Sequence, residues 1–388
     1  MDTQQFSLYL HIPFCKTMCT YCAFNTYVDL DDLIPAFVQA LAREIRIVGT
    51  ANPEMPLKSI FFGGGTPSLI TPQQYRVLFQ AIRESFVLAP DCEISLESNP
   101  NDLTEAYLVQ LRAIGFNRIS IGMQSANPDV LTLFNRRHDM AMTRAAVSAA
   151  RAAGFDNISL DLIFASPHET LATWRETLQA AIALEAHHIS HYELILKGGT
   201  ELTERVKTGD LPAIDDDLAA DMYELATEML QQAGYRQYEI SNWSRDGYQS
   251  QHNLQYWRNL PYLGLGPGAH GFADGVRYIV TRSPQKYIDS LQTVASDYAF
   301  PRTPAVSKAT IVDRTTDMAE TIMMGLRLTE EGINRAVFRQ RFDADIVDLH
   351  RVTVEKFVGY GLLHVDDERM RVTEAGRLLN NAIIRELI

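Results

Sequence analysis

Three features are absent from this 388-residue sequence, and each absence excludes a class of protein. No apolar run approaches the ~20 residues that a membrane-spanning helix needs, so we expect no transmembrane segment. Lys and Arg number 35 against 48 Asp and Glu, and the net charge of −13 argues against nucleic acid as a partner, because phosphate binding requires clustered basic residues. Four cysteines, three of them clustered, do not make a disulfide framework.

The clustered cysteines stand in a short stretch near the N-terminus. They have the spacing C-x3-C-x2-C and are Cys15, Cys19 and Cys22. Three thiolates on one loop can hold three irons of a [4Fe–4S] cluster and leave the fourth iron open to another ligand. Zinc or inert cysteines are the alternatives. A structural zinc usually has four ligands from paired knuckles, and no second knuckle is present, although His11 could supply a ligand.

Strands and helices alternate through the first half of the chain. Predicted strands span 6–12, 59–62, 93–97, 118–122, 158–164 and 189–194, and predicted helices span 31–48, 72–86, 104–114, 141–153 and 170–184. This alternation predicts an α/β fold, a partial or full (β/α) barrel with a parallel sheet. Active sites of such barrels lie at the carboxyl ends of the strands. The cysteine loop, Glu97, Gln124 and Asp161 all fall at or just beyond such ends.

The C-terminal part of the chain loses this alternation. A further helix is predicted at 218–233 and a strand at 235–240. We expect a boundary near 301–304 that separates a barrel domain, residues 1–300, from a smaller domain, residues 301–388. Predicted helices at 305–326, 334–342, 346–360 and 373–387 and a hairpin at 362–372 give a mostly helical, winged-helix-like domain. On this acidic chain we expect it to pack as a lid and not to bind DNA.

The cysteine spacing resembles the signature of the radical S-adenosylmethionine (SAM) superfamily. The resemblance implies that SAM caps the open iron and is cleaved after transfer of one electron from the cluster. The glycine run at 63–67 resembles the GGGTP motif of that superfamily, which implies contact with the SAM amino group. An arginine fork at Arg136 could clamp the SAM carboxylate. Tyr9 and Tyr21 flank the cysteine loop and could pack against the cluster or SAM.

The order of these motifs resembles the oxygen-independent coproporphyrinogen III oxidase family from about residue 7 to the C-terminus. The stretches 97–100, 122–125 and 157–163 contribute to this resemblance. By position it implies eight SAM contacts, namely Tyr9, Gly64, Gly65, Thr66, Glu97, Gln124, Arg136 and Asp161. Polar residues at strand ends also have an ordinary structural use as hydrogen-bond partners.

Two features separate the chain from the true oxidases of that family. The oxidases carry a further cysteine where Phe24 stands, and an N-terminal extension where only 14 residues precede Cys15. In contrast, the stretch 252–257 resembles the HNxxYW motif of the HemW-type heme chaperones. This implies heme binding through His252, Tyr256 and Trp257, although such a stretch is also typical of a loop packed on a core. His270 is a second candidate heme ligand.

The sequence therefore predicts a cytoplasmic radical SAM protein with three bound groups: a [4Fe–4S] cluster, SAM and heme. The resemblance implies delivery of heme to apo-proteins of respiration, with transient contact to membrane proteins. We expect SAM cleavage but no coproporphyrinogen oxidase activity. The alternatives are oxidative decarboxylation of coproporphyrinogen III in porphyrin biosynthesis, heme breakdown by radical methylation, and a non-catalytic zinc protein. The sequence departs from the family pattern at 134–138 and 164–168, so it does not define which partner the pocket accommodates.

Overall fold

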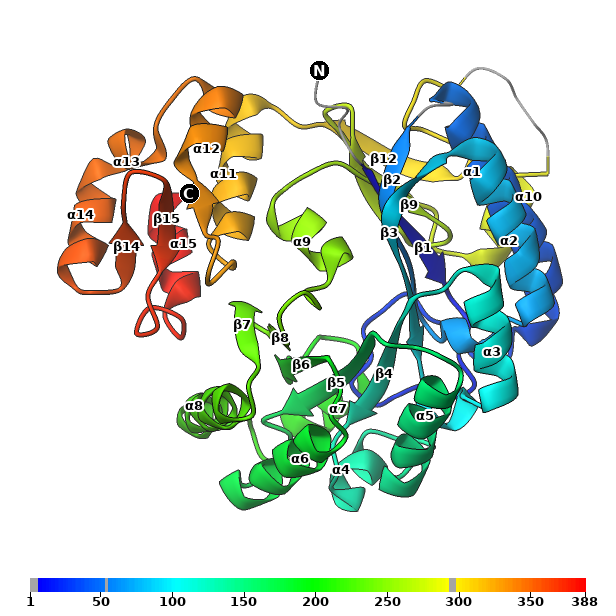
Figure 1. Ribbon diagram of the computed structural model, residues 1–388, viewed down its shortest axis with the longest axis horizontal. Helices are drawn as coiled ribbons and strands as arrows, with labels where there is room; N and C mark the ends of the chain where they lie inside the picture. The colour runs from blue at the N-terminus through cyan, green and yellow to red at the C-terminus, as the bar shows by residue number, and fades with distance from the viewer. Residues whose placement is uncertain (1–5, 53–54, 293–297) are drawn as a thin grey trace.

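The computed structural model describes residues 6–52, 55–292 and 298–388 (Figure 1). Its centre is a 12-stranded sheet in the order β12-β11-β10-β9-β1-β2-β3-β4-β5-β6-β8-β7. Six neighbours in this order are parallel: β1 (Phe6–Ile12), β2 (Pro56–Gly64), β3 (Val87–Ser98), β4 (Arg118–Gln124), β5 (Ile158–Phe164) and β6 (His188–Glu193). The order runs between two free edges, β12 and β7, so the barrel is partial.

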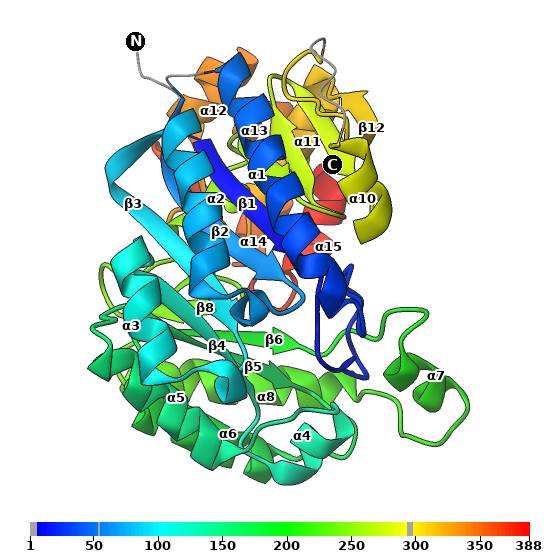
Figure 2. The same ribbon diagram turned by 90° about the vertical axis from the view of Figure 1, so that its right-hand side faces the viewer.

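Helices cover the outer face of the sheet (Figures 1 and 2). They are α1 (Ile34–Ala51), α2 (Pro72–Ser85), α3 (Glu105–Ile114), α5 (Met140–Ala152), α6 (Leu171–Ala183) and α8 (Asp216–Gln232). In β1, Leu8, Leu10 and Ile12 are fully buried in the core that the sheet shares with α1 and α2. Side chains alternate between the faces of a strand, so Tyr9 and His11 point to the opposite, inner face.

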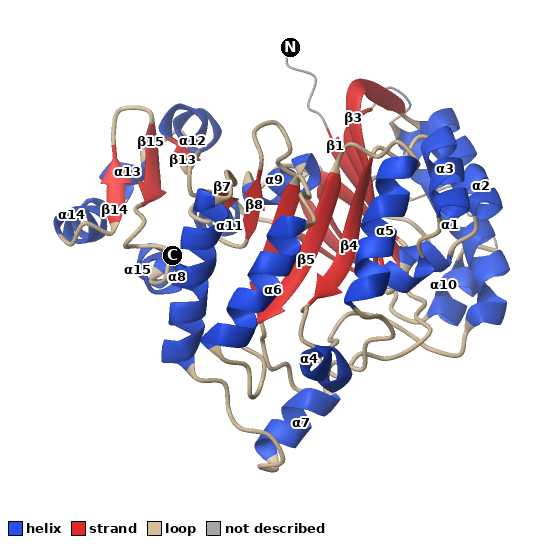
Figure 3. Cartoon of the chain, turned by 60° about the horizontal axis from the view of Figure 1, so that its bottom comes forward, coloured by secondary structure: helices blue, strands red, loops and turns tan. Residues whose placement is uncertain are grey.

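Both edges of the sheet carry short strands that the sequence did not predict. At one edge β9 (Tyr262–Leu265) is parallel to β1, followed by the antiparallel β10 (His270–Ala273), β11 (Val276–Val280) and β12 (Val306–Ile311). At the other edge β8 (Asn242–Ser244) and the predicted strand β7 (Arg236–Glu239) are antiparallel. The remaining helices of the barrel are α4 (Pro128–Leu133), α7 (Glu201–Lys207), α9 (Gln251–Trp257) and α10 (Pro284–Ser290), and Figure 3 shows α4 and α7 beyond the strand ends.

The prediction of one helix over 305–326 is wrong in its first part. Residues 306–311 form β12, and only Arg314–Gly325 is helical, as α11. Pairing with β11 satisfies the backbone of this β-branched segment, and a local sequence pattern does not report such a distant partner. The strand β12 belongs to the large sheet. The domain boundary near residue 301 stays a prediction.

A second core lies in the C-terminal part and contains residues from Ile322 to Leu387. After α11 its elements are β13 (Ile333–Asn334), α12 (Arg335–Phe342), α13 (Ile346–Leu349), α14 (Arg351–Gly359), β14 (Leu363–Val365), β15 (Arg369–Val372) and α15 (Asn380–Leu387). The predicted hairpin is present and β13 extends it to three strands. The predicted helix 346–360 is broken at His350, and the predicted helix 373–387 begins only at Asn380.

None of the helices described by the structure combines the length and the apolar character needed to cross a bilayer.

Candidate functional site

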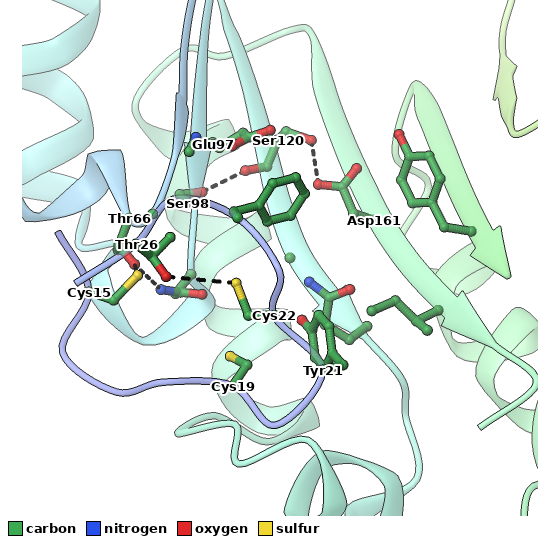
Figure 4. A pocket seen from close by; sticks show the side chains of 18 of the residues that line it. Cys15, Cys19, Tyr21, Cys22, Thr26, Thr66, Glu97, Ser98, Ser120 and Asp161 are labelled. Atoms are coloured by element: carbon green, nitrogen blue, oxygen red, sulfur yellow. Dashed lines mark hydrogen bonds between the residues drawn. The ribbon is translucent and has the colours of Figure 1, made fainter. Parts of the chain in front are cut away.

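The carboxyl ends of the parallel strands surround a cavity of about 580 Å³, called the rim cavity here (Figure 4). Its walls contain the residues after β1 together with residues of β3 to β6. The three clustered cysteines line it as free, partly exposed thiols. Figure 4 shows the sulfur atoms of Cys15, Cys19 and Cys22 gathered in one part of the cavity.

Backbone hydrogen bonds fix the cysteine loop. The Cys15 N–H donates to the Tyr27 carbonyl at 2.8 Å, and the Tyr27 N–H donates to the Pro13 carbonyl at 2.7 Å. Farther along, the Thr20 hydroxyl donates to the Leu133 carbonyl at 2.7 Å, which ties the loop to the end of α4. The loop is therefore held at both sides before any ligand binds.

The cysteine side chains suit iron ligation. Burial raises the pKa of Cys15 to about 11 and also raises the pKa of Cys22, so their thiolates need a cation as partner. Among the residues that the structure describes, no three His, Cys, Asp or Glu side chains are close enough to share one metal ion. A [4Fe–4S] cluster does not require the three thiolates to share one metal ion, because each thiolate binds a separate iron.

The glycine run brings β2 against the cysteine loop. The Gly65 N–H donates to the Ile12 carbonyl at 2.7 Å. A Cβ on Gly65 would lie 2.7 Å from the Phe14 carbonyl oxygen and 3.0 Å from Cys15 Sγ, too close for any other residue. Gly64 has φ +114°, which favours glycine. The run therefore lets β2 lie directly against the cysteine loop, and Gly64 and Gly65 line the rim cavity there.

Two half-buried carboxyl groups line the cavity beyond the glycine run. Burial raises the pKa of Glu97 to about 8, and the nearby Asp161 contributes to the rise. The Gly64 N–H donates to Glu97 at 3.0 Å, and the Ser120 hydroxyl donates to Asp161 at 2.8 Å. Burial also raises the pKa of Asp161. A cationic group of a ligand would be attracted here, because it would stabilise the ionised carboxylates.

Arg136 supplies a positive charge in the cavity wall. Its guanidinium donates to Asn99 Oδ1 at 2.6 Å, to the Gly122 carbonyl at 3.1 Å and to Cys19 Sγ at 3.4 Å. Its Nε is buried and has no partner among the described residues. A guanidinium oriented in the cavity wall is suited to bind the carboxylate of a ligand.

Most of the residues predicted from the sequence meet at the rim cavity. They are Cys15, Cys19, Cys22, Tyr21, Gly64, Gly65, Thr66, Glu97, Gln124, Arg136 and Asp161. Tyr9 is not part of the cavity wall, and its hydroxyl is hydrogen-bonded to His11 Nδ1 at 2.9 Å. Thr66 donates to Cys15 Sγ at 3.4 Å, so the predicted motifs contact each other directly.

The predicted heme contacts do not form one site. His252 is 1% exposed, and its ring nitrogens are hydrogen-bonded to Ser59 Oγ and Tyr256 Oη, both at 2.8 Å. Trp257, one residue after Tyr256, lines a different cavity. His270 is exposed at the start of β10. Iron ligation by His252 would require it to give up at least one of these bonds.

Several cavity residues were not predicted, although the sequence carries a signal for them. In β4, Arg118, Ser120 and Gly122 occupy alternate positions that lead to the predicted Gln124, and all four residues line the cavity. Their period of two marks an inward face. Asn99 donates to Thr66 Oγ1 at 3.3 Å and accepts from Arg136, and it stands two residues after the predicted Glu97.

Comparisons with known proteins agree with this geometry. The family model of the Radical SAM superfamily matches residues 9–181, and that of the HemN C-terminal domain matches residues 312–379. The protein named heme chaperone HemW of Mycobacterium tuberculosis is 36% identical over 392 aligned positions, which cover 100% of this chain and 96% of the relative. The Bacillus subtilis protein of the same name is 33% identical, with 97% of each chain covered.

A solved structure gives the same fold. Coproporphyrinogen III oxidase (HemN) from Escherichia coli superposes with a TM-score of 0.83 at 24% identity, covering 100% of this chain and 91% of that chain. The likeness to this enzyme concerns the fold alone, whereas the similarity to the two relatives extends over the whole sequence at 33–36% identity. The chain therefore belongs to the HemW family of the radical SAM superfamily.

Proposed function

We propose that this protein is a heme chaperone, which binds heme and transfers it to apo-proteins of respiration and carries a SAM-binding [4Fe–4S] cluster. The observation that carries the proposal is the full-length similarity to relatives named heme chaperone HemW. We place the protein in the cytoplasm, with transient contact to membrane proteins when heme is delivered. Nucleic acid is not a partner in this proposal.

In this proposal the rim cavity holds the cluster and SAM. Cys15, Cys19 and Cys22 ligate three irons, and the cluster supplies the electron that cleaves SAM. Glu97 and the glycine run receive the SAM amino group, and the Arg136 guanidinium receives the carboxylate. The remaining proposed contacts are Tyr9, Tyr21, Gln124 and Asp161.

The second candidate function is oxidation of coproporphyrinogen III, favoured by the fold shared with HemN. Phe24 argues against it, because the true oxidases have a cysteine at this position. The Phe24 side chain is 69% exposed and lines the rim cavity, where it cannot ligate a metal. We therefore propose that oxidase activity is absent.

One anaerobic sample can test both functions. The reconstituted protein is assayed for iron and sulfide, titrated with hemin, and incubated with coproporphyrinogen III and SAM. We expect a [4Fe–4S] content, saturable heme uptake seen in the heme absorption band, and no conversion of the porphyrinogen. No change of the heme band would end the chaperone proposal, and conversion would support the oxidase.

Cysteine variants test the cluster separately. Cys19→Ser should lose most of the bound iron and sulfide, whereas Cys92→Ser should keep it, because Cys92 is buried in β3 away from the cavity. Zinc without sulfide in the wild-type protein would instead support the zinc alternative.

A further inference from the structure

The rim cavity continues below the proposed SAM contacts into the interior of the barrel, and we call this part the inner arm. Its wall includes the polar residues Arg118, Ser120, Ser159, His188, Ser250 and Asn253. Arg118 pairs with Ser95, two residues before Glu97, so the inner arm reaches roughly 7 Å below the level of Glu97. Figure 1 shows α9, which begins after Ser250 and contains Asn253, on the concave side of the sheet.

Small side chains keep the inner arm open. The interior of a (β/α) barrel is usually filled by bulky branched side chains. Here Ser120 of β4 lies beside Ser159 of β5, and Asp161 of β5 lies beside Ser190 of β6. Serine side chains are too short to fill the space between the strands, and that space belongs to the cavity. The barrel therefore has room for a polar ligand group below its rim.

Arg118 places a cation in this wall without a counter-charge. The residue is 3% exposed, and it makes no ion pair with the described residues. Its Nη1 donates to Asn157 Oδ1 at 2.7 Å and to the Tyr248 carbonyl at 3.2 Å, and both acceptors are neutral. Buried charges in proteins are normally paired, because an uncompensated charge is costly away from water. An anionic ligand would therefore stabilise this wall.

Donors for such a ligand are available on both sides of the inner arm. Nε and Nη2 of Arg118 make no hydrogen bond within the described part of the chain, and neither is among the enclosed atoms that lack a partner, so both keep accessible surface. Asn253 uses its backbone N–H for Ser250 Oγ, whereas its side-chain amide makes no hydrogen bond within the described ranges. The edge of a guanidinium binds a carboxylate through two parallel N–H···O bonds.

The carboxyl groups of the surrounding elements are engaged elsewhere. Glu93 of β3 accepts from two backbone N–H groups of α9, at 3.1 and 3.2 Å, and so caps that helix. Asp161 accepts from the Ser120 hydroxyl, and burial raises the pKa of Asp161, which favours its neutral form. A carboxylate in the inner arm would therefore meet Arg118 without strong repulsion from these two groups.

We propose that the inner arm binds a carboxylate, held by the Nε and Nη2 atoms of Arg118 and by the Asn253 amide. This anion site is separate from Arg136, which lies beside Cys19 at the rim. Two sources can supply the group, a propionate of heme or a small free carboxylate. The propionate rests on the proposed chaperone function, whereas the anion site itself does not.

Acetate tests the site without heme. Arg118→Gln removes the charge, Asn253→Ala removes the amide, and Asn381→Ala, at an exposed position of α15, is the control. Acetate is titrated into each reconstituted protein at constant ionic strength, with chloride as the reference anion, and thermal unfolding is followed by circular dichroism. We expect acetate to raise the Tm of wild type and N381A, to raise it less in N253A and to leave R118Q unchanged, because a ligand stabilises only a folded state that binds it.

Hemin and its dimethyl ester, whose propionates are blocked, distinguish the two sources. If a propionate enters the inner arm, wild type should bind hemin about tenfold more tightly than the ester, and R118Q should bind both equally. Equal affinities in wild type, together with an acetate effect, would assign the site to a free carboxylate. The affinity for SAM, measured by equilibrium dialysis, should stay within about threefold of wild type in both variants.

The anion site is overturned if R118Q and N253A match wild type with acetate, hemin and the ester. It is also overturned if SAM affinity falls as far as affinity for the other ligands, because the substitutions would then have disturbed the whole cavity. Should R118Q not fold, the comparison of N253A with N381A decides. Absence of heme uptake by all four proteins would end the chaperone proposal, and the acetate result would still decide the anion site.

Discussion

At the residue scale, Arg136 and Arg137 are neighbours with different surroundings. Arg136 is oriented by Asn99, Gly122 and Cys19, whereas Arg137, which also lines the rim cavity, makes an ion pair with Asp102 at 3.2 Å that a lysine can also make. Arg136→Lys keeps the charge but loses the planar fork that serves several acceptors at once. We expect it to weaken SAM binding by about 10–100-fold, equivalent to one hydrogen bond to a charged group. Arg137→Lys is the matched control and should stay near wild type in equilibrium dialysis with SAM.

The Arg136 comparison would be contradicted if both lysine variants lost SAM affinity equally. That result would mean that the planar guanidinium of Arg136 has no specific role in holding SAM.

Glu169 offers a test by pH away from the cluster. It is buried in the loop after β5, where its Oε2 accepts from Ser166 and its Oε1 has no partner within the described part of the chain. Burial raises its pKa from 4.5 to about 7. Between these values the folded protein keeps a proton that the unfolded chain has released, so the free energy of unfolding falls as the pH rises, by about 3 kcal/mol in total.

The glutamine in Glu169→Gln does not ionise, so the variant should lack this decrease in the free energy of unfolding with pH. Relative to wild type, the free energy of unfolding of the variant should therefore rise by about 2.5 kcal/mol between pH 5 and pH 8. Urea unfolding of the cluster-free proteins at both pH values measures this difference, in which the other titrating groups cancel. Parallel pH dependence of the two proteins would show that Glu169 ionises normally.

At the element scale, the contact between β2 and the cysteine loop depends on Gly65. A methyl group there would meet two backbone oxygens, of Phe14 and Ile12, at 2.7 and 2.9 Å. Because backbone cannot move aside as a side chain can, we expect Gly65→Ala to displace the loop and cost about 1–3 kcal/mol of stability. Gly198→Ala, where nothing lies within 4 Å, is the control. Iron content and the free energy of unfolding report the two effects, and unchanged values for Gly65→Ala would refute the close approach.

The central strands were predictable because each carries its own pattern. The strands at 6–12 and 158–164 have the bounds predicted from their short apolar runs. The edge strands β9 to β12 were missed because they are four to six residues long and depend on neighbours distant in sequence. Their pairing is a tertiary interaction, so local propensity does not reveal it.

The sequence predicted the strand-end part of the candidate site but not the arrangement of the heme motif. Motif residues at strand ends, such as Glu97 and Asp161, meet in the rim cavity because parallel strands end at one rim. His252 and Trp257 stand in one motif but lie on a helix, where five positions apart do not share a face. One side chain is therefore buried beside Ser59, and the other lines a different cavity, which also contains residues of α11 and α12.

At the scale of the whole molecule, ion pairs join the barrel to the C-terminal part. Arg258 pairs with Glu331, Arg277 with Glu320 and Arg327 with Glu239. The first two pairs are partly exposed and contribute little each. The third differs, because the Glu239 side chain is fully buried.

Arg327 therefore has a larger effect on docking than the other arginines at this interface. Burial raises the pKa of Glu239, and Arg327 opposes that rise from 3.4 Å while its guanidinium stacks on Trp257. Arg327→Ala leaves a buried carboxylate without its counter-charge, which should cost about 3 kcal/mol in the free energy of unfolding. Arg351→Ala removes an arginine from an exposed pair with Asp348 and should change the free energy of unfolding by less than about 0.5 kcal/mol.

The same variant separates docking from folding. Since the C-terminal part has its own core, loss of Arg327 should loosen its contact with the barrel before that core unfolds. Hydrogen exchange should then rise first at β7 and at the start of β13, while α14 keeps its protection. A uniform rise over both parts would mean that barrel and C-terminal core unfold as one unit, and the ion pair would then stabilise the molecule without controlling how the two parts separate.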